Sequence, residues 1–230
     1  MVPRRSFLSR LGISVPALGG AVAAGALASQ AQAASGSEWQ AARHAQDDWL
    51  DQLPGKHRML FDTTTAAGLG QSLRFANNFF NANKTAYGLQ DADLAVIIVV
   101  RHNSTPFAFN DAIWAKYGGA LTQLTELNDP KTKEAPTVNL FNAPAYGGAL
   151  PNQGNLLDGL LKRGVQLAVC QLATSHAAST IAAKTGGETA AITAELVANR
   201  VTNSRMVPAG IVAVNRAQER GYAFAYAAGV

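Results

Sequence analysis

The chain has 230 residues, of which 48% are apolar and 15% are charged. This balance excludes a disordered or low-complexity chain, and the length suits one sizeable domain or two very small ones. A single cysteine excludes a disulfide-stapled scaffold, an iron–sulfur cluster held by this chain alone and a zinc site with several cysteine ligands.

The formal net charge of +4 is concentrated at the N-terminus. Residues 1–33 contain Arg4, Arg5 and Arg10 and no acidic residue. Without these three arginines, the 19 basic residues fall to 16 against 15 acidic ones, which leaves a net charge of +1. Because nucleic-acid binding needs a clear excess of positive charge, the nearly neutral remainder predicts no nucleic-acid partner.

Residues 1–33 have the parts of an export signal. Residues 4–8 (RRSFL) resemble a twin-arginine motif, in which two arginines and one variable residue precede two large apolar side chains. An uncharged, alanine- and glycine-rich stretch follows at 11–28, and residues 31–33 (AQA) fit the small-x-small cleavage rule. We therefore expect cleavage after Ala33 and export of the folded protein by the twin-arginine machinery to a bacterial periplasm.

The alternative is that residues 11–28 remain in the membrane as an anchor, since a spanning helix needs about 18–20 apolar residues. The weak hydrophobicity of this stretch and the cleavage site directly after it favour a cleaved signal. No stable membrane anchor is then expected after cleavage.

The rest of the chain alternates between predicted strands and helices. Residues 34–56 form a polar extension in which Trp39, Trp49, Leu50 and Leu53 indicate a short amphipathic helix. The β-branched apolar run at 93–101 is typical of a central strand in a parallel sheet. Further strands are predicted at 57–63, 165–172, 206–207 and 222–226. Helices are predicted at 69–83, 106–117, 156–162, 174–184, 188–199 and 209–220, the second ending at Gly118 and Gly119.

This alternation predicts one α/β domain at 57–230, with a mainly parallel sheet of about five strands and helices on both faces. Residues 118–151 are rich in proline and glycine and are expected to form a long excursion. Sites in such sheets lie beyond the carboxyl ends of the strands. That rule selects residues 63–70, 101–105 and 170–175.

Cys170 is the most informative residue of these segments. It lies near the end of an apolar strand, and a helix is expected to begin at Thr174 or Ser175. The N–H groups and the dipole of a helix N-terminus favour a thiolate, which is the nucleophilic and sulfur-carrying form. The alternative is a packing role, because free cysteines are among the most buried residues.

Three segments resemble the DsrE/DsrF/TusD-like family. Residues 164–173 (GVQLAVCQLA) resemble its cysteine segment, in which a hydrophobic strand ending in Cys leads into a helix. Residues 207–212 (VPAGIV) and 218–224 (QERGYAF) resemble the C-terminal pattern V-P-x-G followed by Q-x-x-G-Y-A. The likeness covers roughly residues 59–226 and is weakest over 118–151.

This resemblance implies an α/β fold, assembly into homo-oligomers and, as in several family members, a cysteine persulfide that relays sulfur. The cysteine that matches is Cys170, and the implied partners are a sulfur donor or acceptor protein or a small sulfur compound. The sequence departs from the best-known members, which are cytoplasmic, in its export signal. The segment 118–151 has no counterpart in the family pattern.

Two histidines accompany Cys170 as candidate catalytic residues. His176 follows Cys170 by six residues and could raise the thiolate fraction, or it could be an ordinary surface histidine near a helix start. His102 follows the central strand, where the site of a parallel sheet is expected. Both are weaker candidates than Cys170.

Four further residues are candidate ligand-binding groups. Arg101 and Asn103 follow the central strand, and Arg101 could bind an anion or could simply end the strand. Thr63 and Thr64 begin a hydroxyl- and glycine-rich turn before a helix, which could bind an anion through backbone N–H groups. No dinucleotide or Walker fingerprint is present, and four scattered histidines define no metal site, so neither a cofactor nor a metal is predicted.

Two functions follow, and they differ in the role of Cys170. The first is a thiol-based sulfur carrier or transferase outside the cytoplasm, with Cys170 as the persulfide-bearing residue. The second is a non-catalytic ligand-binding or assembly module of the same fold, with Cys170 as a structural residue. Fold alone does not decide between them.

The export signal gives the first testable prediction. Replacement of Arg4 and Arg5 by lysine should leave the precursor in the cytoplasm, because the twin-arginine route recognises the guanidinium pair. Fractionation and immunoblotting of precursor and mature forms measure this. Export and trimming of the lysine variant at the wild-type level would refute the assignment.

Overall fold

The structure of the protein is a computed structural model that describes residues 40–229. The predicted export signal at 1–33 and Trp39 lie outside the described residues. Within residues 40–229, no helix has the length and apolar character that crossing a membrane requires.

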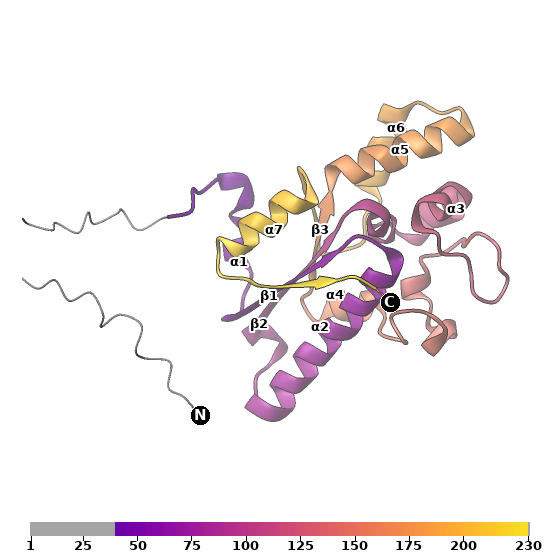
Figure 1. The fold of residues 1–230 in the computed structure, drawn as a ribbon. Helices are drawn as coiled ribbons and strands as arrows, with labels where there is room; N and C mark the ends of the chain where they lie inside the picture. Colours follow the sequence, from indigo (N-terminus) through magenta and orange to yellow (C-terminus); the bar gives the residue numbers. More distant parts are fainter. Residues whose placement is uncertain (1–39, 230) are drawn as a thin grey trace, which may run out of the picture. The chain divides into compact units, whose positions relative to one another are not determined.

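A five-stranded, all-parallel sheet forms the centre of the domain, in the order β4-β3-β2-β1-β5 (Figure 1). The predicted α/β class, parallel sheet and two helical layers are confirmed. The strands are β1 (His57–Thr63), β2 (Leu94–Val100), β3 (Gln166–Cys170), β4 (Ser204–Val207) and β5 (Ala223–Ala227). The α-helices are α1 (Trp49–Gln52), α2 (Ala66–Tyr87), α3 (Asp111–Thr125), α4 (Leu157–Lys162), α5 (Gln171–Thr185), α6 (Thr189–Ala198) and α7 (Gly210–Gln218).

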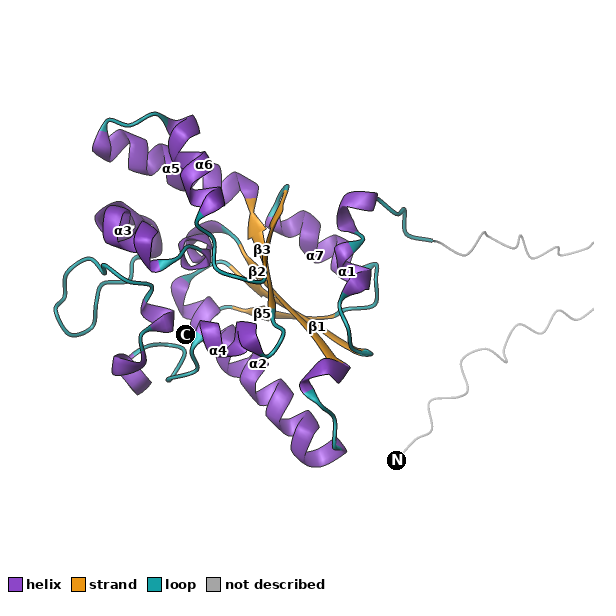
Figure 2. Ribbon diagram, turned by 180° about the vertical axis from the view of Figure 1, so that it is seen from behind, coloured by secondary structure: helices purple, strands orange, loops and turns teal. Residues whose placement is uncertain are grey.

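Strand β2 is buried along its whole length, so both faces of the sheet must be covered. Val96, Ile98 and Val100 belong to the larger core, beneath α2, α3, α4 and α5. The alternate residues Ile97 and Val99 belong to the smaller core, beneath α1 and α7. Figure 2 shows the sheet between these two groups of helices.

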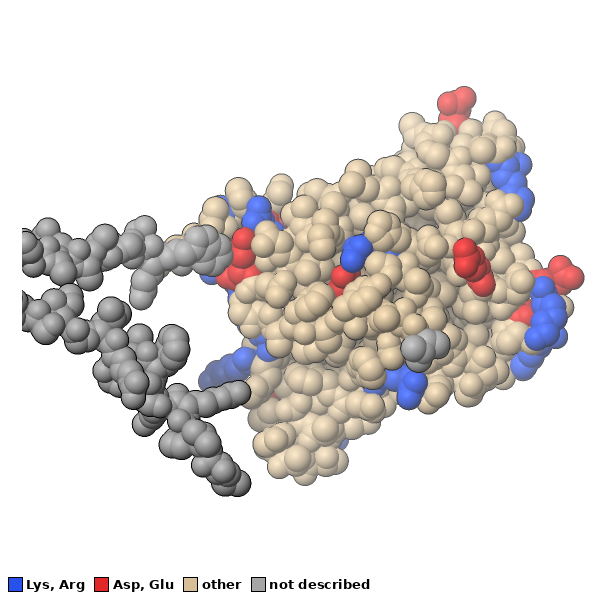
Figure 3. Space-filling model, in the orientation of Figure 1, with Lys and Arg blue, Asp and Glu red and all other residues tan. Residues whose placement is uncertain are grey.

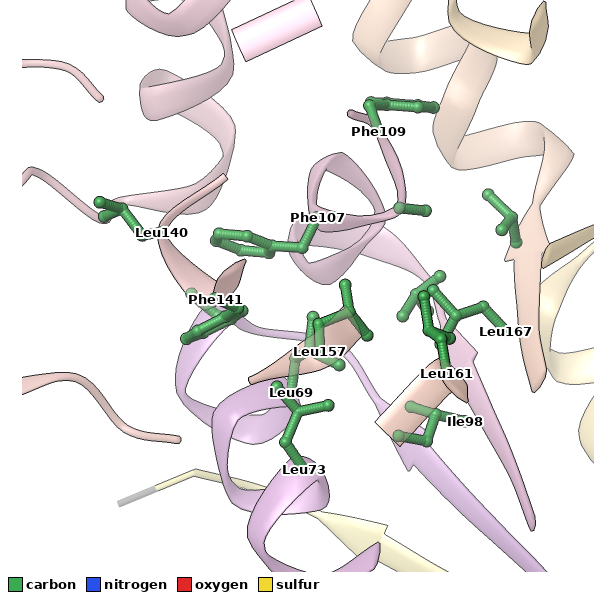
Figure 4. Packing of buried hydrophobic residues seen from close by; sticks show 14 of the residues in the cluster. Leu69, Leu73, Ile98, Phe107, Phe109, Leu140, Phe141, Leu157, Leu161 and Leu167 are labelled. Carbon is green, nitrogen blue, oxygen red and sulfur yellow. The ribbon is translucent and has the colours of Figure 1, made fainter. Parts of the chain in front are cut away.

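The larger core also includes part of the segment 118–151. Phe107, in the 3-10 helix η3 (His102–Ala108), packs against Phe141 of η4 (Leu140–Asn142), with ring centres 4.5 Å apart (Figure 4). Leu140 and Leu150 are buried in the same core. Part of this segment therefore packs on the larger core, on the same face of the sheet as α2 and α3.

The extension at 34–56 is tied to the domain through α1. Trp49 and Leu50 are buried in the smaller core, and the Tyr222 hydroxyl donates a 2.7 Å hydrogen bond to the Leu50 carbonyl. Burial raises the pKa of Tyr222 to about 12. The short helix predicted from this apolar pattern is present, and it closes the sheet face that α7 leaves open.

Helix α3 differs from the helix predicted at 106–117. Pro106 belongs to η3, and α3 begins after Asn110, whose side chain accepts the N–H of Ile113. The helix continues through Gly118 and Gly119 to Thr125. Gly118 is present because a Cβ there would lie 2.0 Å from the Pro136 carbonyl oxygen, so this glycine permits packing and does not end the helix.

Strand β3 ends at Cys170, and α5 begins at the next residue, earlier than the predicted start at Thr174 or Ser175. Helix α2 is also longer than predicted at both ends. Thr65 caps its N-terminus by accepting the Gly68 N–H at 2.9 Å, and Gly88 ends it with a left-handed φ of 67°.

The neighbouring glycines of α3 provide a matched test of this packing. Alanine is favoured over glycine in a helix by roughly 0.5–1 kcal/mol, so Gly119→Ala, which meets only the flexible end of Lys184 at 3.5 Å, should stabilise the protein. Gly118→Ala should destabilise it, because the Pro136 backbone must move. Urea denaturation measures both changes, and equal stabilisation by both would contradict the packing described here.

Candidate functional site

The helices that follow the neighbouring strands β3 and β4 pack on opposite faces of the sheet. Strand β3 leads into α5, which packs on the larger core, and β4 leads into α7, which packs on the smaller one. Figure 1 shows α5 and α7 on either side of β3. Neighbouring parallel strands whose following helices lie on opposite faces leave a crevice beyond their carboxyl ends, where ligands commonly bind. The candidate site lies there.

A cavity of about 330 Å³ occupies this crevice. Its lining residues come from the end of β2, from the β3–α5 junction and from the start of α7. They are Arg101, His102, Asn103, Cys170, Leu172, Ala173, His176, Ala209, Gly210 and Ile211. Five of the seven candidate site residues are thus brought together, whereas Thr63 and Thr64 do not line the cavity.

Cys170 joins β3 to α5. It is the N-cap residue of α5, and its Sγ accepts the Ala173 N–H at 3.4 Å. Its carbonyl accepts the Thr174 hydroxyl at 2.9 Å, which fixes the first turn. The residue is 6% exposed and still lines the cavity. Its Sγ therefore lies at the N-terminus of α5 and borders a space that can admit a small molecule.

Arg101 is held in place by a buried carboxylate. Its Nε and Nη2 donate to the two Asp62 oxygens at 2.8 Å each, and the Asp62 side chain is only 3% exposed. The hydrogen bond to Asp62 raises the pKa of Arg101 above its ordinary value. Because the pair is bidentate, the guanidinium has one fixed plane at the cavity wall.

Gly210 allows α7 to approach this arginine. A Cβ at Gly210 would lie 2.7 Å from Arg101 Cβ and 2.8 Å from Arg101 Cδ. A larger residue would therefore displace either the first turn of α7 or the guanidinium. Close packing against Arg101 therefore explains why the V-P-x-G pattern has a glycine at this position.

Thr63 points away from the cavity into the larger core. Its hydroxyl donates to the Val99 carbonyl at 2.8 Å and lies 2.9 Å from Ser104 Oγ, and both side chains are fully buried. The Thr63 hydroxyl is therefore used within the protein, and Thr63 does not line the cavity. Ser104 also accepts the Arg101 N–H at 3.0 Å, so this network fixes the end of β2.

Thr64 lies outside the cavity, directly after β1. Its hydroxyl is 2.8 Å from the Tyr226 hydroxyl, and its carbonyl accepts the Asn103 N–H at 3.0 Å. The side chain is thus engaged with β5. Asn103 is fixed by the same contact while it lines the cavity.

The two histidines lie at the mouth of the cavity. His102 is exposed and has a left-handed backbone, with φ of 51°, and His176 is exposed in the second turn of α5. Leu172 and Ile211 lie at the same mouth and are 67% and 58% exposed. The apolar rim and Gly210 were not among the residues expected from the sequence, although residues 209–212 belong to a motif noted there.

The face of the molecule that Figure 3 shows carries few charged side chains. In Figure 3, Lys, Arg, Asp and Glu side chains form small separate groups of both signs on a largely uncharged face. Among residues 40–229, no group of three or more His, Cys, Asp and Glu side chains is arranged to hold a metal ion.

Comparison with protein families, curated proteins and solved structures gives no match: no family model, no curated protein and no solved structure is similar to this chain.

The Asp62–Arg101 pair can be tested by a double-mutant cycle. Asp62→Asn should lower the free energy of unfolding by roughly 2–4 kcal/mol, because it leaves Arg101 partly buried without its counter-ion. Arg101→Met should lower the free energy of unfolding less in the Asp62→Asn variant than in the wild-type protein. Chemical denaturation of the four proteins gives the coupling energy, and additivity within about 0.5 kcal/mol would show that the pair does not act as a unit.

Proposed function

We propose that this chain is an exported, DsrE-like sulfur carrier in which Cys170 bears a persulfide. The position of Cys170 supports the proposal most directly. The only cysteine of the chain lies at the N-terminus of α5, beside a cavity between the segments that follow β3 and β4. The three sequence segments that resemble the DsrE/DsrF/TusD-like family include this cysteine and the Gly210 that borders the same cavity.

The chemistry is a transfer of sulfane sulfur between thiols. The Cys170 thiolate attacks the outer sulfur of a persulfide donor R–S–SH, so a bond from Sγ to that sulfur forms. The S–S bond of the donor breaks, and R–S⁻ leaves with the electron pair. A thiolate acceptor then attacks the outer sulfur of Cys170–S–SH and restores the Cys170 thiolate, so the cycle consumes no external oxidant or reductant.

Several groups favour an anionic sulfur at this position. The first turn of α5 supplies N–H groups, of which Ala173 already donates to Sγ at 3.4 Å. Arg101 uses Nε and Nη2 to bind Asp62, and its Nη1 donates no hydrogen bond to another described residue. His176 and His102 at the mouth are suited to exchange a proton with a donor or acceptor thiol.

The same proposal gives the protein a place outside the cytoplasm. The twin-arginine motif and the AQA cleavage site support export to the periplasm, where Cys170 would meet donors and acceptors that differ from those of cytoplasmic relays. Because the chain has one cysteine, onward transfer needs a partner molecule.

The second candidate function is a binding or assembly module in which Cys170 is structural. The observation that favours it is the low exposure of Cys170, 6%, together with its use as the N-cap of α5. In that case the thiol replaces a serine or aspartate cap, and the cavity binds a ligand without covalent chemistry.

Mass spectrometry separates the two functions. Incubation of the protein with a sulfane-sulfur donor should add about 32 Da for each sulfur bound to the Cys170 peptide, and a reductant should reverse the addition. Cys170→Ser should remove the adduct while the fold is kept, because serine is also a good N-cap. His176→Ala, with Cys170 intact, should still form the adduct but more slowly.

Alkylation of native protein provides the independent readout. A reactive thiolate should be labelled rapidly below pH 8, since an ordinary cysteine has a pKa of about 8.5. Wild-type protein that stays unmodified by both the donor and small alkylating reagents would exclude the carrier function and favour the structural one.

A further inference from the structure

A groove runs along the free edge of the sheet, beside β4. Two cavities of about 450 and 300 Å³ adjoin here, and Gln46 and Met206 line both. Strand β4 is the outermost strand on this side, and residues of the segment 45–52 form the opposite wall. One end of the groove reaches Gln171, the residue that follows Cys170.

Alternate residues of β4 direct their backbone N–H and C=O groups to β3, and the residues between them direct theirs to the free edge of the sheet. The Leu167 N–H donates to the Asn203 carbonyl at 2.8 Å, and Leu167 pairs with Ser204 in the parallel register. Alternate residues of a parallel strand bond to the same neighbour, so Asn203 and Arg205 direct their backbone groups to β3. Ser204 and Met206 therefore direct their N–H and C=O groups to the free edge, toward the groove.

Arg200 and Arg205 line this groove. The carboxylate of Asp47, which also lines it, lies 3.6 Å from Arg216. Among the ion pairs of residues 40–229, neither Arg200 nor Arg205 takes part. Arg200 donates instead to the Val197 carbonyl and to Ser204 Oγ. The Arg205 guanidinium lies 5.6 Å from the centre of the Trp49 ring. Burial lowers the pKa of Arg200, as expected for a half-buried cation.

The arginines lie on opposite sides of the strand edge. Arg205 pairs with Ala168 of the smaller core, so its side chain is on the α7 side. Arg200 is bonded to Ser204, which pairs with Leu167 of the larger core. Since successive side chains of an extended chain point to opposite faces, two adjacent acidic residues would reach one arginine each.

We propose that the β4 edge binds an extended segment of a partner protein that carries two adjacent acidic residues, which it adds to the sheet as a sixth strand. The unpaired backbone groups of Ser204 and Met206 supply the hydrogen bonds of strand addition, and the arginines supply the selectivity. A second copy of this chain is a poor occupant, because edge-to-edge pairing would bring arginines of both copies together. The assignment does not depend on sulfur transfer.

The test uses ¹⁵N-labelled protein and two blocked peptides. One has two adjacent acidic residues flanked by β-branched residues, and the other has the corresponding amides in their place. The acidic peptide should shift the amide signals of Ser204 and Met206 saturably, and the amide peptide should bind about fivefold more weakly or worse, as the loss of exposed ion pairs implies.

Three variants locate the contact. Met206→Pro removes an outward N–H and keeps the bonds to β3, so it should abolish the shifts. Arg205→Gln should weaken binding about fivefold, and it keeps the test valid if the proline variant does not fold. Arg74→Gln, on α2 and away from the groove, should bind like wild type.

Several results would overturn the proposal. These are equal affinity for both peptides, shifts confined to residues away from β4, or wild-type binding by both Met206→Pro and Arg205→Gln. Dimerisation of the protein that Met206→Pro removes would also overturn it, because the occupant of the edge would then be a second copy.

Discussion

The fold depends on one strand that is apolar on both faces. Each residue of β2, from Leu94 to Val100, is buried, so water must be excluded from both sides of the sheet. The helices that follow β1, β2 and β3 cover one side, and α1 together with the connection from β4 to β5 covers the other. Helix α7 packs on that opposite face, so the segments that follow the paired ends of β3 and β4 lead to different faces of the sheet. The requirement for a dry central strand and the existence of the crevice at Cys170 thus have the same origin.

The sequence predicts elements best where local composition is decisive. Strand β1 has the predicted bounds. Strand β2 differs from its prediction by one residue at each end, because a long β-branched apolar run leaves little choice. The errors occur where tertiary contacts decide. In the sequence, Gly118 indicates a helix end, whereas in the fold it allows α3 to pack against Pro136. Helix α5 begins at Gln171 because the Cys170 thiol replaces a conventional cap. Neither contact is visible in local propensity.

The site could be predicted in outline and not in its fine structure. The rule that sites lie at carboxyl ends of parallel strands is enough to bring Arg101 and Cys170 together. The partner of Arg101 could not be predicted, because Asp62 reaches it only through the β1–β2 register, which places Asp62 beside Val99. The inward direction of Thr63 follows from that register as well, since adjacent strand residues face opposite sides of the sheet. Side-chain direction at a strand end is therefore the information that a single sequence lacks.

The pairing of β1 with β5 has a consequence for biosynthesis. Thr64 and Tyr226 are 162 positions apart and meet through their hydroxyls, so the first strand of the sheet acquires its outer neighbour only after almost the whole domain has been translated. A nascent chain can pair β1 to β4 in order as it leaves the ribosome. The backbone groups of β1 that bond to β5 have no strand partner until β5 has been translated. Closure of such a long loop is slow compared with local folding. The sheet is therefore complete only once β5 has paired with β1, which is compatible with a proposed export route that accepts finished domains.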